Sequence, residues 1–281
     1  MAWVVAVANQ KGGVGKTTTA VNLAAALALE GHRTLLVDLD PQSSATTGVG
    51  LRSADLQGSV YEMLLDGRPA RELVHKTSID ALDLIPATRD LVGAEIELVT
   101  VAEREHRLHA GLADVRDAYR VILIDCPPSL SLLTVNALRA ADGVLVPLQA
   151  EYYALEGLTA LLDTVERVRR GLNPTLALDG IVLTMIDRRS SLARQVEDEV
   201  RTHFGAQTFS TAIPRNVRLS ESPSHGMPVL RYSPSSRGAV AYRALGREFA
   251  ERHVAQLQQP QLEESTQERT HEDAEGVGQG A

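Results

Sequence analysis

The sequence predicts an α/β fold in which helices cover both faces of a doubly wound, mainly parallel sheet. Three observations support this class. Short apolar runs alternate with longer stretches of helical character for most of the 281 residues. The runs are apolar along almost their whole length rather than at alternate positions, as in strands that are buried on both faces. Polar residues follow directly after several runs, where the strands of such a sheet end and ligands bind.

Six strands and two principal helices follow from this pattern. A Gly-rich turn separates the first strand from a helix predicted over 16–29, and Gly31 is well placed to end that helix. The last helix is predicted over 239–256. The predicted strands span residues 4–8, 34–39, 82–86, 121–125, 144–147 and 181–185. Strands separated by helices in this way form a parallel sheet.

The chain divides into one folded domain over 1–257 and a tail over 258–281. The tail contains six acidic residues and one arginine, so it carries −5 of the formal net charge of −8. It has almost no apolar residues and cannot bury enough surface to offset its ordering entropy, so disorder is predicted. The remaining −3 argues against a uniformly basic nucleic-acid binder but allows a local basic patch.

Three features of the sequence favour a cytoplasmic protein. No run of about 18 apolar residues is present, so no contact with a membrane through a spanning helix is expected. The first residues have the pattern of a strand and lack the basic start and the cleavage site of a secretory signal. Cys126 is the only cysteine, which excludes an intramolecular disulfide and an all-cysteine metal site within one chain.

The first strand leads into a phosphate-binding loop. Glycines let backbone N–H groups converge on phosphate oxygens, and the following helix N-terminus adds partial positive charge. Lys16 can reach the β- and γ-phosphates of a nucleotide, and the Thr17 hydroxyl can ligate Mg²⁺. A Gly-rich turn that only joins strand to helix is the alternative. The loop consists of Lys11, Gly12, Gly13, Val14, Gly15, Lys16, Thr17 and Thr18.

The loop departs from the general phosphate-loop pattern at its start, where Gln10 stands in place of glycine and Lys11 adds a second lysine. In this feature the sequence resembles the ParA/MinD group of P-loop NTPases, and specifically the ParA (Soj) chromosome and plasmid partition ATPases. The resemblance implies a homodimer that encloses two ATP molecules, in which Lys11 crosses to the nucleotide of the second subunit. A cation placed there stabilises charge that develops during phosphoryl transfer. The alternative for Lys11 is a solvated loop lysine.

Three aspartates follow predicted strands on the side of this loop. Asp38 and Asp40 lie two residues apart, so both side chains are directed to one side of the chain. Asp125 follows four apolar residues in the manner of a Walker B aspartate and would hold a water in the Mg²⁺ shell. The resemblance implies that Asp40 orients the attacking water and that Asp38 contacts Mg²⁺ or positions the loop. The alternative, strongest for Asp38, is a cap on the turn before Pro41. Cys126 is interpreted as a small core residue.

Two late segments, 184–187 and 213–216, correspond to the parts of the resembled family that flank the adenine. The resemblance implies contacts from Met185, Pro214 and Asn216. The residues themselves support this only by their position, because each segment follows a late strand on the nucleotide side of the sheet. Ordinary loops are the alternative.

The same region is rich in arginine. Guanidinium groups bind phosphates in a bidentate fork and give salt-sensitive DNA affinity that is independent of sequence. The resemblance implies that Arg189 and Arg218 bind double-stranded DNA nonspecifically, and only in the ATP dimer. The alternative is a set of solvated arginines that pair with acids such as Glu197 and Glu221. The arginines are Arg188, Arg189, Arg194, Arg201, Arg215, Arg218, Arg231 and Arg237.

The resemblance covers residues 4–251 and also rests on segments 37–42, 151–158 and 213–221. It implies a nucleoid-associated ATPase in DNA partition whose slow hydrolysis is stimulated by a ParB-type centromere-binding protein. MinD-like proteins end in an amphipathic helix that lies on membranes, whereas this chain ends in an acidic polar tail. Nitrogenase-iron-protein relatives need two cysteines per subunit for a shared cluster, whereas this sequence has only Cys126. Two other functions stay open: a metabolic ligase or kinase of the biotin- or cobalamin-synthesis type, and a nucleotide-dependent polar-localisation scaffold.

Overall fold

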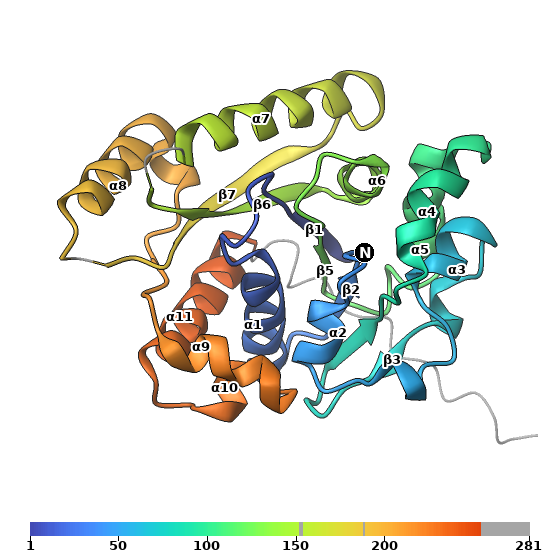
Figure 1. Ribbon diagram of the computed structural model, residues 1–281, viewed down its shortest axis with the longest axis horizontal. Coiled ribbons are helices and arrows are strands. Elements are labelled where there is room, and N and C mark those ends of the chain that lie inside the picture. Colours follow the sequence, from blue (N-terminus) through green and yellow to red (C-terminus); the bar gives the residue numbers. More distant parts are fainter. Residues whose placement is uncertain (152–153, 188, 254–281) are drawn as a thin grey trace, which may run out of the picture.

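A computed structural model of the chain describes residues 1–151, 154–187 and 189–253, and these residues contain one seven-stranded sheet (Figure 1). The strand order is β3-β4-β2-β5-β1-β6-β7. Neighbouring strands are parallel except for β3 and β4. The strands are β1 (Trp3–Val7), β2 (Thr34–Asp38), β3 (His75–Lys76), β4 (Leu82–Ile85), β5 (Val121–Asp125), β6 (Gly143–Gln149) and β7 (Ala177–Thr184).

This architecture confirms the predicted fold class, and each of the six predicted strands is present. The largest difference is at β7, which begins at Ala177 instead of residue 181. The sequence pattern did not indicate β3, because two polar residues at a sheet edge carry neither an apolar run nor an alternation. It pairs with β4 in the antiparallel direction and ends the sheet on that side.

Helices cover both faces of the sheet. In Figure 1, α1 and α11 lie side by side on one face, and α6 and α7 lie on the other. The α-helices are α1 (Lys16–Leu29), α2 (Ser44–Gly48), α3 (Val60–Leu65), α4 (Leu91–Glu97), α5 (Arg107–Leu112), α6 (Leu132–Ala140), α7 (Ala154–Gly171), α8 (Ser191–Phe204), α9 (Val217–Glu221), α10 (Val229–Tyr232) and α11 (Arg237–Arg252). Single 3₁₀ turns are η1 (Ser53–Asp55), η2 (Ala70–Glu72), η3 (Leu98–Thr100), η4 (Arg104–His106), η5 (Gly205–Gln207) and η6 (Ser222–His225).

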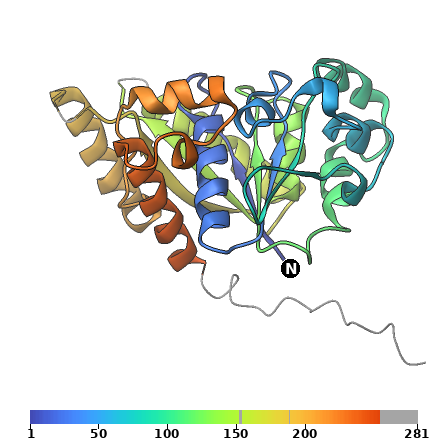
Figure 2. The same cartoon turned by 90° about the horizontal axis from the view of Figure 1, so that it is seen from below.

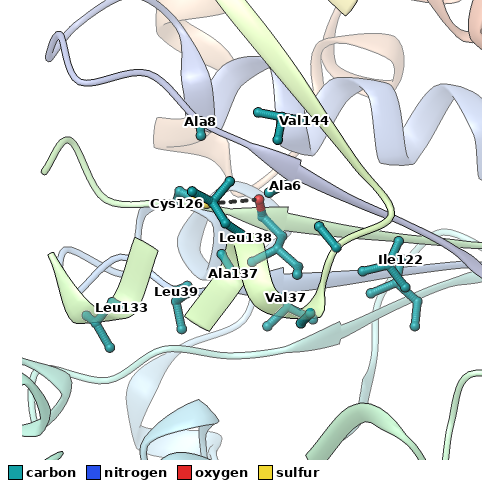
Figure 3. Packing of buried hydrophobic residues seen from close by; sticks show 14 of the residues in the cluster. Ala6, Ala8, Val37, Leu39, Ile122, Cys126, Leu133, Ala137, Leu138 and Val144 are labelled. Atoms are coloured by element: carbon teal, nitrogen blue, oxygen red, sulfur yellow. Dashed lines mark hydrogen bonds between the residues drawn. The ribbon is translucent and has the colours of Figure 1, made fainter. Parts of the chain in front are cut away.

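Successive residues of each central strand pack on opposite faces of the sheet. In β1, Val4 and Ala6 belong to the core beneath α6 and α7, whereas Val5 and Val7 belong to the core beneath α1 and α11. Both sets are fully buried, which explains why the strand is apolar at every position. Figure 3 shows part of the first core, where Cys126 lies among apolar side chains. The interpretation of Cys126 as a core residue is therefore confirmed.

The helix ends agree with local capping rules. Gly31 follows the end of α1 with a φ of 88°, a left-handed conformation that glycine adopts without strain. The Ser236 side chain accepts a hydrogen bond from the Ala239 N–H, so α11 begins at Arg237, two residues before the predicted start. The predicted end of this helix at residue 256 and the predicted tail over 258–281 lie outside the described residues. In the part of the chain that is described, no helix is both long and apolar enough to cross a membrane.

Gly246 lets α11 approach α1 closely, which gives a stability test. A Cβ at Gly246 would lie 2.8 Å from Ala26 Cβ, whereas a Cβ at Gly157 on α7 would meet no atom within 4 Å. We expect Gly246→Ala to lower the free energy of unfolding by about 1–2 kcal/mol, because overpacking outweighs the gain in helix propensity. Gly157→Ala should raise it by about 0.5–1 kcal/mol. Urea denaturation followed by circular dichroism measures both, and equal stability of the two variants would contradict the close packing.

Candidate nucleotide-binding site

The ends of β1, β2 and β5 meet at one point of the sheet. Val7 and Asp38 each pair with Asp125 in the strand register, so the three strands end level with one another. The chain leaves β1 into the phosphate loop at this point, while β2 leads into the segment that contains Asp40. Crevices outside the carboxyl ends of parallel strands, where the strand order reverses, are where α/β proteins bind ligands. The predicted loop and the three predicted aspartates are thereby brought together.

The phosphate loop has the backbone conformation that its glycines allow. Gly13 and Gly15 have φ values of 75° and 88°, in the left-handed region. Added Cβ atoms at Gly12 and Gly13 would meet nothing within 4 Å, so the space above the loop is open. Within the described residues, no side chain caps the N-terminus of α1, and its first turn holds no acidic residue. The free N–H groups and the helix dipole therefore favour a bound phosphate.

Lys16 is held inside this loop. Its side chain is buried and its Nζ donates to the Lys11 carbonyl oxygen at 3.1 Å. Burial lowers the pKa of Lys16, and the nearby charges of Asp125 and Asp40 oppose that shift. A partly desolvated ammonium next to two carboxylates is well placed to exchange its carbonyl partner for phosphate oxygens.

Two residues that the sequence reading missed fix the shape of the loop. Asn9 donates from Nδ2 to the Pro147 carbonyl at 2.8 Å and accepts the Lys11 N–H at 2.9 Å through Oδ1. Thr184 Oγ1 donates to the Val14 carbonyl at 2.8 Å. These bonds tie the loop to β6 and β7. Asn9 lies two residues after the end of β1, and a polar residue at that place was a usable signal. Thr184 lies 170 positions from Val14, and no local pattern indicated their contact.

Both carboxylate oxygens of Asp38 accept hydrogen bonds from nearby residues of the same chain. Its Oδ2 accepts the backbone N–H and the hydroxyl of Thr46 at 2.8 and 2.7 Å, and its Oδ1 accepts the Asp40 N–H at 3.2 Å. Burial raises the pKa of Asp38 to about 6, against the opposing effect of the Thr46 hydrogen bonds. Of the two roles predicted for Asp38, this geometry favours positioning of the loop, because Thr46 lies on α2.

Asp40 lies at the rim of the same site and is mostly buried. Its Oδ1 accepts the Gln42 N–H at 2.9 Å, just as Asp38 Oδ1 accepts the Asp40 N–H, so the turn-capping alternative is realised at both aspartates. Oδ2 accepts no hydrogen bond from any residue that the structure describes. One oxygen thus fixes the carboxylate, and the other is free to accept a proton or a hydrogen bond from a water.

Asp125 is the least satisfied polar group of the site. It is fully buried, and neither carboxylate oxygen has a hydrogen-bond partner with ordinary geometry among the described residues. Burial raises the pKa of Asp125 well above its ordinary value, and the charge of Asp38 adds to the shift. The Thr17 hydroxyl and Lys16 are close enough to oppose it. An unpartnered buried carboxylate beside a threonine hydroxyl fits the needs of a Mg²⁺ ion.

The side chains that the structure describes around Asp125 include few metal ligands. No group of three or more His, Cys, Asp or Glu side chains suited to a metal ion occurs in the described ranges. Mg²⁺ is commonly held by one or two carboxylates together with substrate phosphates and waters. The arrangement of Thr17 and Asp125 therefore fits a Mg²⁺ ion that arrives with a nucleotide.

The buried charge at Asp125 predicts a pH-dependent gain in stability for Asp125→Asn. The folded pKa is raised above the unfolded value of 3.8, so the wild-type folded state loses stability as pH rises from about 4 toward the folded pKa. Asparagine removes that loss. We expect the variant to match wild type near pH 4 and to exceed it by about 1 kcal/mol or more at pH 7.5 without Mg²⁺. Urea denaturation at both pH values measures this, and a constant difference would contradict the buried charge.

The predicted adenine contacts lie beside the phosphate loop. Ile186 forms a parallel bridge with Pro214, so segments 184–187 and 213–216 run next to each other. Met185 has a φ of 53°, which is unusual for a residue with a side chain, and its Cε would lie 3.8 Å from a Cβ at Gly15. Asn216 caps α9 through Oδ1, which accepts the Arg218 N–H at 2.9 Å. Only the amide NH₂ of Asn216 is left for a base.

A pocket of about 260 Å³ opens beside the first two turns of α1. It shares Thr17 and Thr18 with the phosphate loop but is not lined by Met185, Pro214 or Asn216. Its remaining lining comes from Val21, Asn22, Ser44, Gly48, Ser222, Pro223 and Met227. The pocket therefore connects α1 with α2 and η6 and does not coincide with the predicted adenine contacts.

The predicted DNA-binding arginines are exposed: Arg189 lies just before α8, and Arg218 lies on α9. The helices α8 and α9 lie toward the same side of the molecule (Figures 1 and 2). The Arg189 backbone N–H donates to Asp187 Oδ1 at 3.0 Å. Arg218 pairs with Glu221 at 2.7 Å, so the ion-pair alternative is realised for this residue. Arg201 also bonds internally, to Glu197 and to the Phe209 carbonyl. Arg188 lies outside the described residues.

Lys11 does not point into its own site. Its Nζ lies 2.6 Å from Glu151 Oε2, and the two side chains are 37% and 47% exposed. Lys16 lies close to Asp125 and Asp40 of its own site. Lys11 instead contacts the connection that follows β6. The side chains of the two lysines of the loop therefore point in different directions.

Comparison with known proteins agrees with this geometry. A family model described as an AAA domain matches residues 2–178. The chromosome partitioning protein ParA of Myxococcus xanthus is 54% identical over 249 residues, which cover 89% of this chain and 88% of that protein. The chromosome-partitioning ATPase Soj of Thermus thermophilus is 56% identical over 248 residues, which cover 88% and 95%.

A solved structure with the same fold carries a different name. The structure of cobyrinic acid a,c-diamide synthase from Mycobacterium smegmatis, with bound ADP and magnesium, superimposes with a TM-score of 0.78. It is 39% identical, and the match covers 91% of this chain and 96% of that one. The match to the family model places the chain in the AAA domain family. Its identity with the two partition proteins shows that, within this family, the chain belongs to the ParA and Soj chromosome-partitioning ATPases.

Proposed function

We propose that this chain is a DNA-partitioning ATPase that is active as an ATP-bound homodimer. The observation that carries the proposal is the opposite orientation of the two loop lysines. Lys16 is buried against the carboxylates of its own site, whereas Lys11 is about one-third exposed and reaches none of them. A cation at the rim of an open phosphate loop can act on a nucleotide held by a second copy of the chain, in the manner of an arginine finger.

Each residue of the site has a distinct part in hydrolysis. Backbone N–H groups of the loop and Lys16 bind the phosphates. Thr17 and Asp125 would hold Mg²⁺ together with the phosphate oxygens, and the ion would neutralise phosphate charge. Asp40 holds the attacking water through its free Oδ2, while Asp38 fixes α2 through Thr46. Met185, Pro214 and the amide of Asn216 contact the adenine.

Dimerisation couples this chemistry to DNA. Two copies of the chain double the arginine surface, and phosphate contacts multiply in the binding constant. ATP therefore raises the affinity for double-stranded DNA, and hydrolysis lowers it again. A ParB-type centromere-binding protein stimulates the slow hydrolysis and so releases the dimer from the nucleoid.

Loss of the two predicted DNA contacts tests this proposal. We expect Arg189→Ala with Arg218→Ala to reduce ATP-dependent retention on nonspecific double-stranded DNA at least about tenfold at low salt and to reduce the salt slope by about 2 to 4. The matched control is Arg170→Ala, which removes an exposed, ion-paired arginine from the last turn of α7. This arginine precedes β7, whereas Arg189 follows it at the opposite end of that strand. Retention equal to wild type in the double variant would show that the DNA face lies elsewhere. Loss of retention in the control as well would indicate a general effect of charge.

The name of the Mycobacterium smegmatis structure favours one other candidate, an ATP-dependent amidation of a corrinoid-like acid. Amide synthesis that takes its nitrogen from glutamine through a cysteine nucleophile would need a reactive thiolate. Cys126 is the only cysteine of the sequence, it is buried, and burial raises the pKa of its thiol. ATP hydrolysis that needs no carboxylic acid acceptor but responds to DNA and a partner protein would exclude this candidate.

The nucleotide-dependent polar-localisation scaffold is distinguished by DNA binding. If DNA fails to retain the ATP-bound form of the protein, the scaffold function would be favoured over partition.

A further inference from the structure

The side chain of Lys11 is held by its own subunit. Its Nζ donates to Glu151 Oε2 at 2.6 Å, and Gln149 Nε2 donates to Glu151 Oε1 at 2.6 Å. Both oxygens of this carboxylate are therefore engaged, and Gln149 fixes the orientation of Glu151 at the end of β6. The contact joins residues 140 positions apart and brings the start of the phosphate loop against the connection between β6 and α7.

The backbone of Lys11 is fixed in the same place. Its N–H donates to Asn9 Oδ1, and Asn9 in turn donates to the Pro147 carbonyl of β6. The Lys11 carbonyl accepts Lys16 Nζ at 3.1 Å. Phosphate oxygens that take Lys16 compete with this last bond, so nucleotide binding loosens one of the contacts of Lys11 while the contact to Glu151 remains.

We propose that Glu151 is a positioning residue that holds Lys11 in its own subunit and competes with its use by a second copy of the chain. This inference rests on the proposed function, because it assumes that Lys11 acts across a dimer. A lysine ammonium is a compact charge and cannot neutralise Glu151 and a phosphate of another subunit at once. Each subunit must therefore break this ion pair before the dimer closes. Breaking the pair opposes dimerisation and raises the dimer dissociation constant.

The size of this effect on the dimer dissociation constant follows from the exposure of the ion pair. An ion pair as exposed as this one shifts an equilibrium by about two- to fivefold. Two such pairs break when a dimer forms, so the factors multiply to about four- to twenty-five-fold. Glu151→Gln keeps the size of the side chain and removes its charge, and it is expected to tighten the dimer by that factor.

The first test measures dimerisation by sedimentation velocity with Mg²⁺ and a slowly hydrolysed ATP analogue. Glu151→Gln should lower the dimer dissociation constant about four- to twenty-five-fold, with the gain shrinking at high salt. The matched control is Glu156→Gln, an exposed glutamate on α7, which should leave the constant unchanged. An unchanged or weaker dimer in Glu151→Gln would overturn the proposal, and a weaker one would place Glu151 in the dimer contact itself.

The second test examines the contact in the monomer, so that its outcome does not depend on dimerisation. Lysine occurs at three positions of the sequence, Lys11, Lys16 and Lys76. Protein with ¹⁵N-labelled lysine should therefore give at most three ammonium signals, and the one absent from Lys11→Ala belongs to Lys11. Glu151→Gln should shift and broaden this signal, and Glu156→Gln should not. If no variant dimerises, the proposed function fails, whereas a Lys11 signal that is unaffected by Glu151→Gln overturns the present inference alone.

Discussion

Lys11→Ala is expected to lower the turnover number for ATP about a hundredfold or more and to leave the affinity of the monomer for ATP within about threefold. The reason is that Lys11 makes no contact with the carboxylates of its own site, where Lys16 already faces Asp125. Removing it takes away charge stabilisation that a second subunit supplies during phosphoryl transfer. A phosphate-release assay with DNA and partner protein measures turnover, and a fluorescent ATP analogue measures affinity.

A matched lysine separates this effect from a general loss of charge. Lys76 pairs with Asp83 at 2.9 Å on the outer strands β3 and β4, far from the loop in the strand order. Lys76→Ala should keep both turnover and affinity within about twofold. If Lys11→Ala weakens ATP binding by the same factor as turnover, Lys11 belongs to the nucleotide site of its own subunit and the trans role is wrong.

Asp40→Ala is expected to reduce hydrolysis about 10²- to 10³-fold and to leave an ATP-bound dimer that persists for as long as ATP is present. In the proposed mechanism the Oδ2 of Asp40, which is not used by the Gln42 contact, holds the attacking water, whereas ATP binding and closure of the dimer depend on other residues. Size-exclusion chromatography with ATP and Mg²⁺ should show a dimer for this variant and mostly monomer for wild type after turnover.

Two further variants control for the structural part of Asp40. Its Oδ1 accepts the Gln42 N–H, so alanine also removes a turn cap. Asp40→Asn keeps an acceptor for that N–H and should trap the dimer equally well. Asp163→Ala, at an exposed position on α7, should behave as wild type. A monomeric Asp40→Asn protein at saturating ATP would contradict the sandwich arrangement.

The parts of the site that the sequence predicted are those that a local pattern of residue types marks. The phosphate loop occupies consecutive positions between a strand and a helix, so its residue types and spacing fix the local geometry. Asp38 and Asp125 were predicted because each ends an apolar run, and the strand register then places them side by side. The same reasoning gave the parallel sheet, since strands buried on both faces are apolar at every position.

The parts that escaped prediction depend on contacts between distant segments. Asn9 meets Pro147 across 138 positions and Lys11 meets Glu151 across 140, and no local pattern encodes either pair. The choice between two roles for Asp38 depended on Thr46, which reaches back from a short helix that the sequence did not indicate. β3 is a two-residue edge strand that only its pairing with β4 defines.

The central claim is that each nucleotide site needs Lys11 from the other subunit, and mixing two inactive variants tests it most directly. In a heterodimer of Lys11→Ala and Asp40→Ala, one site has its own Asp40 and receives Lys11 from the partner, while the other site lacks both. When equal amounts are mixed as monomers before ATP is added, random assortment makes about half of the dimers mixed, so about a quarter of the initial wild-type rate of ATP turnover should return. Turnover that stays at the sum of the two separate variants would contradict the account.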